Sequence, residues 1–277
     1  MKRIIRVFPR KTEATPGDDL VYINEPPPMF LPEAEEVHIS VAFTYDIPRA
    51  EWLYKQWEVV GTPVKMGGPA FGKPSGESEP GLYLKEGYAF TSRGCPNKCW
   101  FCSVWKREGP LRTMPIKNGW VVQDDNLLAC PEEHIRAVFD MLGRQPHRPI
   151  FKGGIEAKIL KPWHIELFLK AKTERLFCAY DTPDDYEPLL EAGKMFEETE
   201  IPIRTTCAYV LIGYPKDTME KAEKRLTDTV KAGFWPFAML WKDDQGHEDQ
   251  KWGQFQREWC NPYIVGAKVS KMLKAVR

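Results

Sequence analysis

The sequence has no long apolar run and no net charge. None of its apolar stretches approaches the roughly 20 residues of a membrane-spanning helix. Residues 1–10 place charges inside a short apolar segment and show no small-residue cleavage site. Lysine plus arginine equals aspartate plus glutamate at 39 each, so no global field attracts nucleic acid, although a local basic groove remains compatible with this balance. We therefore expect a protein with no membrane partner, and nucleic acid stays open as a partner.

The sequence also lacks the cysteine pattern of a disulfide framework or a zinc ribbon. Four of its seven cysteines, Cys130, Cys178, Cys207 and Cys260, are scattered at long intervals and supply no second C-x2-C pair. This arrangement does not predict a secreted, disulfide-stapled fold. A reducing compartment suits it better, and we expect a cytoplasmic protein.

The other three cysteines, Cys95, Cys99 and Cys102, stand together in the segment Cys-Pro-Asn-Lys-Cys-Trp-Phe-Cys. A structural zinc ion or an electron-transfer 4Fe-4S cluster normally takes four protein ligands, and the five histidines all lie far from this segment in the sequence. Three thiolates therefore leave one metal corner open. An open corner is a position at which a further molecule can bind and react.

The C-x3-C-x2-C spacing, with an aromatic residue just before the last cysteine, resembles the cluster loop of the radical S-adenosylmethionine (SAM) superfamily. The resemblance implies that Cys95, Cys99 and Cys102 ligate a 4Fe-4S cluster whose open iron is chelated by SAM. It implies reductive cleavage of SAM to methionine and a 5'-deoxyadenosyl radical, with an electron donor such as flavodoxin or ferredoxin. A zinc site with a remote fourth ligand is the alternative, and it would make the chain a non-catalytic iron-sulfur or zinc binding module.

From residue 82 onward, apolar strand-like segments alternate with amphipathic helical segments. Near-continuous apolar strands separated by helices pair in parallel with right-handed crossovers, so this pattern predicts an α/β fold. Six such strands predict a partial (β/α)6 TIM-like barrel, which is also the core that the resemblance implies, with its site at the carboxyl ends of the strands. The predicted strands are 87–92, 120–123, 149–152, 175–180, 205–212 and 234–241, and the predicted helices are 131–144, 162–172, 184–199 and 218–232.

Proline and glycine density divides the chain. Residues 61–81 are rich in residues that interrupt regular structure, which predicts a loop and linker. Before them, a strand-like segment at 36–43 and a helix at 48–57 predict a small α/β N-terminal portion. The predicted units are therefore 1–81, a partial barrel at 82–242, and an aromatic helical extension at 243–277 that covers the barrel.

The segment Thr91-Ser-Arg-Gly-Cys-Pro resembles the branch of the superfamily that often carries a cobalamin-binding domain. The Asp-x-His-x-x-Gly motif that donates an axial histidine is missing, and ~90 residues are few for a complete doubly wound domain. We expect the N-terminal portion to be a truncated relic of such a domain without the cofactor.

Residues after two predicted strands resemble the parts of the superfamily that hold SAM. Gly153, Gly154 and Glu156 resemble the glycine-rich edge that receives the amino group of SAM, although an extra residue here separates the glycines from the glutamate. Ile212 and Gly213 resemble the segment that packs near the adenine. The alternative for Gly153, Gly154 and Glu156 is a tight turn with a solvated glutamate. The alternative for Ile212 and Gly213 is an ordinary strand end.

Charged and polar residues near strand ends are further candidates. Asp181 is a candidate for binding the SAM ribose or orienting the substrate, with the N-cap of the following helix as the alternative. Arg204 is a candidate for pairing with the SAM carboxylate, with a surface salt bridge as the alternative. Asp124, Asp125 and Asn126 are candidates for substrate contacts.

The aromatic segment 241–263 predicts either a cover for the open end of the barrel or a surface that stacks an aromatic substrate. Cys260 within it is a candidate for returning a hydrogen atom to a product radical, and a small buried hydrophobe is the alternative. Because ligands for cobalamin and for a second cluster are missing, we expect rearrangement or epimerisation of a small molecule or modified nucleobase. One specific version is a phage-type isomerase that rearranges an amino-acid adduct on thymine during DNA hypermodification.

Overall fold

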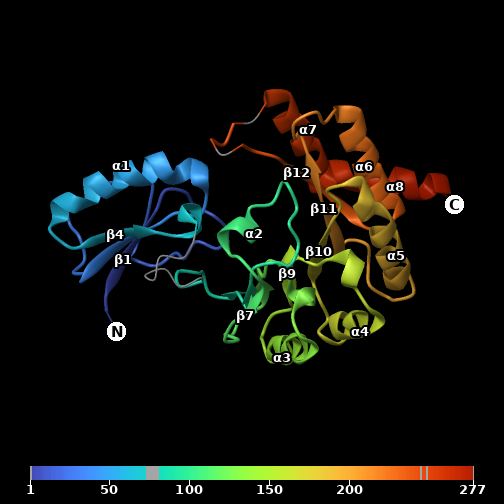
Figure 1. Cartoon of the computed structure of the whole chain (residues 1–277), viewed down its shortest axis with the longest axis horizontal. Helices are drawn as coiled ribbons and strands as arrows, with labels where there is room; N and C mark the ends of the chain where they lie inside the picture. The colour runs from blue at the N-terminus through green and yellow to red at the C-terminus, as the bar shows by residue number, and fades with distance from the viewer. Residues whose placement is uncertain (1, 73–80, 244, 248, 277) are drawn as a thin grey trace.

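Two parallel β-sheets lie side by side along the long axis of the molecule (Figure 1). The computed structural model describes residues 2–72, 81–243, 245–247 and 249–276. Within these ranges, no helix has both the length and the apolar character that crossing a membrane requires. Short 3-10 helices at Thr44–Asp46, Glu58–Val60, Pro69–Phe71, Leu127–Ala129, Ala157–Ile159 and Pro183–Asp185 connect the longer elements.

The N-terminal sheet has four parallel strands in the order β2-β1-β3-β4. Its side chains alternate between two faces, and those of Val37 and Ile39 are buried against helix α1 (Ile47–Trp57), which contributes Leu53 and Trp57. The predicted strand at 36–43 and helix at 48–57 are therefore confirmed. The strands are β1 (Ile4–Phe8), β2 (Val21–Ile23), β3 (Glu36–Ser40) and β4 (Val64–Gly67).

Strand β4 corrects the prediction that residues 61–81 form only loop and linker; of that range, residues 73–80 lie outside the described residues. Val64 pairs with Val37 and Gly67 with Ser40, so β4 adds to the exposed edge of β3. Backbone pairing with β3 thus orders the four residues of β4. Their neighbours are rich in glycine and proline and show no pattern that predicts a strand.

The C-terminal sheet has six parallel strands in the order β12-β11-β10-β9-β8-β5. Along the chain, each strand of this sheet pairs with the previous one, and a helix connects most such pairs. The predicted strands and helices are thereby confirmed to within a few residues. The strands are β5 (Tyr88–Ala89), β8 (Val121–Val122), β9 (Ile150–Gly154), β10 (Arg175–Ala179), β11 (Thr206–Ile212) and β12 (Trp235–Leu240). The helices are α3 (Glu132–Leu142), α4 (Pro162–Lys170), α5 (Tyr186–Glu197) and α6 (Met219–Lys231).

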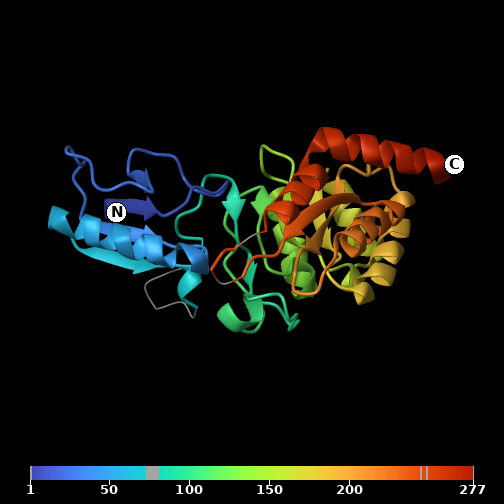
Figure 2. The ribbon, with the colours of Figure 1, turned by 90° about the horizontal axis from the view of Figure 1, so that it is seen from above.

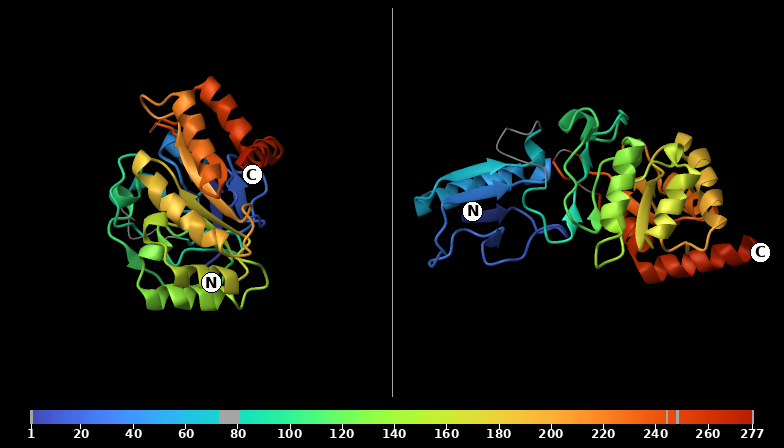
Figure 3. Two further views of the ribbon diagram at one scale, coloured as in Figure 1. Left: turned by 90° about the vertical axis from the view of Figure 1, so that its right-hand side faces the viewer. Right: turned by 90° about the horizontal axis from the view of Figure 1, so that it is seen from below.

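The two faces of this sheet differ. One face packs against α3 to α6 (Figure 3) and forms the main core. In this core the rings of Phe139, Phe151 and Phe168 meet with centroids 5.1 to 5.3 Å apart. The other face carries Phe177 stacked on Tyr209, with ring centroids 4.3 Å apart. The sheet therefore keeps an aromatic surface on the side away from its helices.

Two helices follow the last strand. Helix α7 (Gln250–Cys260) contacts β12, the edge strand of the sheet, and α8 (Pro262–Val276) runs along the outside of the molecule to the end of the chain (Figure 2). The side chains of Gln256 and Cys260 both donate to the Ala238 carbonyl of β12, at 3.2 Å each. Helix α7 thus covers a sheet edge that would otherwise expose unpaired backbone groups.

Candidate functional site

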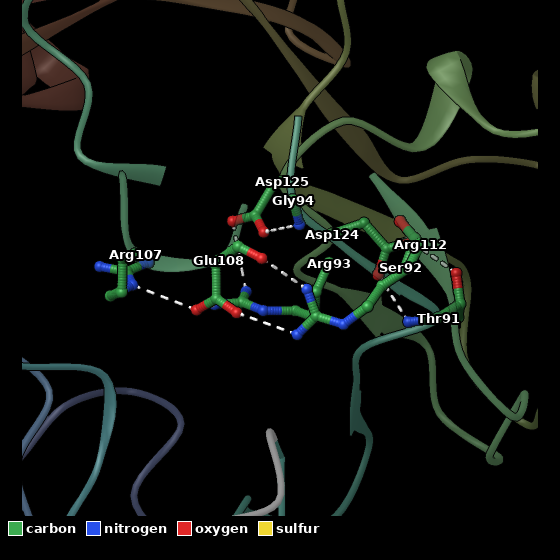
Figure 4. A network of polar contacts seen from close by, with 9 residues as sticks. All are labelled: Thr91, Ser92, Arg93, Gly94, Arg107, Glu108, Arg112, Asp124 and Asp125. Atoms are coloured by element: carbon green, nitrogen blue, oxygen red, sulfur yellow. Dashed lines mark hydrogen bonds and ion pairs between the residues drawn. The ribbon is translucent and has the colours of Figure 1, made fainter. Parts of the chain in front are cut away.

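A buried network of charges anchors the loop that carries the three cysteines. This loop runs between the strands β6 (Ser92–Arg93) and β7 (Arg112–Thr113) and includes helix α2 (Val104–Arg107). Arg93 lies between Glu108 and Asp125, with N–O distances of 2.5 and 3.3 Å, and all three side chains are less than a tenth exposed (Figure 4). Asp125 also accepts the backbone N–H of Gly94 at 2.8 Å. The charges therefore fix the backbone immediately before Cys95.

Two close contacts explain the sequence at this point. Gly94 has φ +86°, and a Cβ there would lie 2.3 Å from the Pro110 carbonyl oxygen, so only glycine fits. Asp124 accepts the Thr91 backbone N–H at 2.6 Å and the Ser92 hydroxyl at 2.8 Å. Burial raises the pKa of Asp124 and of Asp125. Both carboxyl groups, expected to contact substrate, instead position the loop.

The three thiols share one loop without forming a closed ligand set. Within the described part of the chain, no three His, Cys, Asp or Glu side chains converge as in a bound metal site. Burial, followed by the neighbouring thiols, raises the pKa of Cys99, and burial raises that of Cys102. A cation between the thiols would offset both effects and stabilise the thiolates, so the donor set suits an iron-sulfur cluster better than free thiolates.

Asn126 connects the cysteine loop to the next strand. Its Nδ2 donates to Glu156 Oε2 at 2.6 Å and to Cys95 Sγ at 3.6 Å. Its Oδ1 is buried and has no hydrogen-bond partner within the described residues, and the whole residue is 3% exposed. A buried acceptor without a partner is costly, so this oxygen favours a ligand with a hydrogen-bond donor. The alternative that Glu156 is merely solvated is wrong.

Gly153 and Gly154 end strand β9, so the tight-turn alternative is also wrong. A Cβ at Gly153 would lie 1.8 Å from the Asp124 carbonyl oxygen, whereas a Cβ at Gly154 would meet only the Asp125 carbonyl oxygen, at 3.3 Å. Packing against the backbone of Asp124, just after β8, therefore suffices to require glycine at 153. At 154 the protein leaves more room, as a ligand edge would need.

Asp181 follows β10 and faces the cysteine loop. Its Oδ1 accepts the Leu211 backbone N–H at 3.1 Å, and its charge contributes to the raised pKa of Cys99. The helix start is capped instead by Thr182 and Asp185 in a capping box, so the N-cap alternative for Asp181 is wrong. Burial, and then the charge of Asp185, raise the pKa of Asp181 to about 7. This carboxyl group is therefore protonated in part at neutral pH.

We expect Asp181→Asn to stabilise the protein at alkaline pH. The folded state holds the Asp181 proton up to about pH 7, whereas the unfolded chain releases it near the ordinary aspartate pKa of 3.8. Stability contributed by this group therefore falls as pH rises from about 4 to 7, and the amide should raise the free energy of unfolding by about 1–2 kcal/mol above pH 7. Urea unfolding at pH 4 and pH 8 measures this. Asp184→Asn, on an exposed neighbour, is the control. An equal gain in the free energy of unfolding in both variants would contradict the raised pKa of Asp181.

The loop after β11 contains Gly213 and Asp217 and is held in place by Arg225 of helix α6. Gly213 has φ +72° and donates its backbone N–H to Asp217 at 2.9 Å, while Arg225 binds Asp217 at 2.7 and 3.1 Å. Ile212, the preceding residue, is fully buried. A Cβ on Gly213 would meet the Trp252 indole at 3.1 Å. Asp217 and Arg225 were missed from sequence because their partners are recognisable only in the folded chain.

This loop also contacts the cysteine loop. The rings of Trp100 and Tyr214 meet edge to face with centroids 5.4 Å apart. The segment that contains Gly213 and the segment that contains the triplet therefore lie together. Chains of contacts thus bring five predicted positions to one edge of the sheet: the Cys triplet, Gly154, Glu156, Asp181 and Gly213.

Two predicted residues lie away from this edge. Arg204 precedes β11 and so lies at the amino end of that strand, where its guanidinium stacks 5.2 Å from the Trp235 ring. The two ends of a strand lie far apart, so the guanidinium lies away from the cysteine loop, and pairing with the SAM carboxylate does not explain this residue. Cys260 lies between α7 and the edge strand, and burial raises the pKa of its thiol to about 11. Its contacts are those of the packing alternative.

No family model matches the chain, and no curated protein matches it. Among solved structures, the chain is similar to TsrM from Kitasatospora setae, a radical SAM methyltransferase with cobalamin and a [4Fe-4S] cluster bound. The TM-score is 0.60 at 11% identity, over 87% of this chain and 75% of that one. At this identity the likeness concerns the fold alone. The resemblance seen in the cysteine loop is therefore confirmed at the level of the fold: this chain folds as a radical SAM protein does.

Proposed function

We propose that this chain is a radical SAM enzyme with a 4Fe-4S cluster and SAM as cofactors. One observation carries the proposal: Cys95 of the triplet lies 3.6 Å from the side-chain amide of Asn126, whose buried oxygen has no hydrogen-bond partner among the described residues. Three thiolates would leave one metal position open beside that amide. The same edge belongs to a sheet of six parallel strands, which we take to be the partial barrel of this fold. The shared fold with TsrM supports the assignment.

The residues present fit such a pair of cofactors. When bound, a cluster with one open iron supplies the electron that cleaves SAM to methionine and a 5'-deoxyadenosyl radical, which abstracts hydrogen from a substrate. Cys95, Cys99 and Cys102 would hold the cluster. Asn126 Oδ1 and Glu156 would accept hydrogen bonds from the amino group of SAM. Both are acceptors, and Asn126 Nδ2 holds the two side chains together by donating to Glu156 Oε2 at 2.6 Å.

The remaining residues would position the rest of SAM. Asp181, with its raised pKa, can donate or accept a hydrogen bond at a ribose hydroxyl. Ile212 and Gly213 would border the adenine, where the fixed φ of Gly213 and its bond to Asp217 hold the backbone rigid. The electron would come from a separate donor such as flavodoxin or ferredoxin.

We further propose that hydrogen abstraction leads to rearrangement or epimerisation. The N-terminal sheet has α1 packed on one face, whereas its other face carries polar side chains such as Glu36 and His38, paired at 2.7 Å. A doubly wound cofactor domain has helices on both faces, and this difference supports our proposal that the N-terminal portion does not hold the cobalamin that methyl transfer from a corrinoid would need.

Anaerobic reconstitution with iron and sulfide tests the function. We expect about four irons per chain, and an electron paramagnetic resonance signal of the reduced protein that changes on adding SAM. Full occupancy by zinc with no uptake of iron would contradict the proposal and favour a zinc binding module.

We expect Gly154→Val to weaken SAM binding while leaving the cluster intact. The branched side chain would project at the end of β9, where SAM would have to approach and where a Cβ meets only the Asp125 carbonyl oxygen, at 3.3 Å. Iron content and the SAM-induced spectral change are the measurements. Gly143→Val, at the end of α3 where a Cβ meets only ordinary contacts, is the control. Unchanged SAM affinity in Gly154→Val would show that this edge does not hold SAM.

A further inference from the structure

We infer that the cavity between the two sheets is the substrate site, and that its substrate is an uncharged small molecule with a planar ring. This inference rests on the proposed function. The cavity has a volume of about 650 Å³, within the range of about 300–1,000 Å³ of small-molecule sites.

The cavity is built from the carboxyl ends of both sheets. Phe8 and Ser40 end β1 and β3, and Gly67 ends β4, on the N-terminal side. Phe90 and Gln123 follow β5 and β8 on the other side. Parallel α/β sheets bind ligands outside the carboxyl ends of their strands, and here two such edges face one space.

The cavity borders the cysteine loop. Arg93 and Glu108 line it, and the same two residues hold that loop through their ion pair of 2.5 Å. Arg93 stands two residues before Cys95, and its guanidinium also contacts Asp125. A molecule in the cavity would therefore lie next to the segment that generates the radical in the proposed function.

Charges around the cavity are already neutralised. Each lysine, arginine, aspartate and glutamate side chain among its described lining residues has an opposite partner: Arg10 with Asp46, Arg93 with Glu108, Lys65 with Glu36, and Glu13 with Lys152. A phosphate or carboxylate would lose its water here without gaining a free cation, which is costly. The pairing therefore favours an uncharged ligand.

The remaining lining groups suit a planar ring. Phe8, Phe43 and Phe90 supply aromatic faces, and Met66 and Met239 supply adaptable thioethers. Gln123 and Ser40 add an amide and a hydroxyl that can fix the ring by hydrogen bonds. Apolar walls with a few polar groups are the usual makeup of a site for a small ring-bearing molecule.

Two dyes that share one ring system test the charge requirement. N-phenyl-1-naphthylamine is uncharged, and 1-anilinonaphthalene-8-sulfonate is the same scaffold with a sulfonate. We expect the uncharged dye to bind with a Kd about tenfold lower, since the sulfonate finds no free cation. Equal affinities, or displacement of the uncharged dye by hydroxocobalamin, would overturn the inference.

A pair of matched variants locates the binding. Met239→Lys should weaken the uncharged dye about tenfold by placing an unpaired charge on the cavity wall. Met29→Lys, at a 91% exposed methionine outside the cavity, should leave the Kd unchanged. Equal effects of the two variants would overturn the location.

Activity of the reconstituted protein tests the link to the radical. Saturating uncharged dye should change the rate at which 5'-deoxyadenosine forms, because an occupied substrate site excludes water. An unchanged rate would overturn the assignment as substrate site. Cys95→Ala should still bind the dye. Dye binding in a protein that never forms 5'-deoxyadenosine would refute the proposed function while leaving the cavity a ligand site, so the two failures are distinguishable.

Discussion

Cys95→Ala, Cys99→Ala and Cys102→Ala are each expected to abolish SAM cleavage. Two thiolates leave a 4Fe-4S cluster without a protein ligand at a second iron, so the cluster is lost or its open corner is no longer unique. Formation of 5'-deoxyadenosine should drop by about a thousandfold or more, since the cluster supplies the electron for the reaction. Iron content and 5'-deoxyadenosine, measured by chromatography after anaerobic reduction, report the two effects separately.

Cys207→Ala is the matched control for these variants. Its thiol is also buried, but it lies on β11 and donates to the Arg204 carbonyl at 3.6 Å, away from the loop. It should keep full iron content and SAM cleavage. Normal iron content and activity in Cys95→Ala would contradict the ligand assignment.

Arg225→Met is expected to have the largest effect on stability. Its side chain is 8% exposed and binds Asp217, which is fully buried, and the Leu211 carbonyl at 2.8 Å. Removing the guanidinium leaves the Asp217 carboxylate buried without a counter-charge, which costs about 3–5 kcal/mol of unfolding free energy. Asp217 also accepts the Gly213 N–H, so SAM affinity should fall as well. Denaturant unfolding measures the first effect.

Two further variants separate the buried charge from general loss of packing. Adding Asp217→Asn to Arg225→Met removes the uncompensated charge and should restore part of the stability. Arg136→Met breaks an exposed pair with Glu132 at 2.7 Å and should cost less than about 0.5 kcal/mol. Equal losses in Arg225→Met and Arg136→Met would refute the role of the buried pair.

The sequence determined where the cysteine loop and the strands and main helices of the C-terminal sheet lie. Apolar periodicity and breaker residues act over short distances, so the six strands of the C-terminal sheet and its four main helices were predicted to within a few residues. The triplet needed no tertiary information because its three thiols belong to one loop. Strand β4 was missed because the partner β3 orders it.

Only the tertiary structure decided what the other residues do. Arg204 and Asp181 both stand near strand ends in the sequence. In the folded chain, however, Arg204 lies at the amino ends of the strands and Asp181 at their carboxyl ends. Asn126 acquired its role because folding brings together residues about 30 positions apart, Cys95 on one side and Glu156 on the other. Such contacts depend on how strands align in space, and local residue patterns contain no record of that alignment. The same reason explains why the cavity between the sheets, lined by residues between Phe8 and Gln123 together with Met239, is visible only in the folded protein.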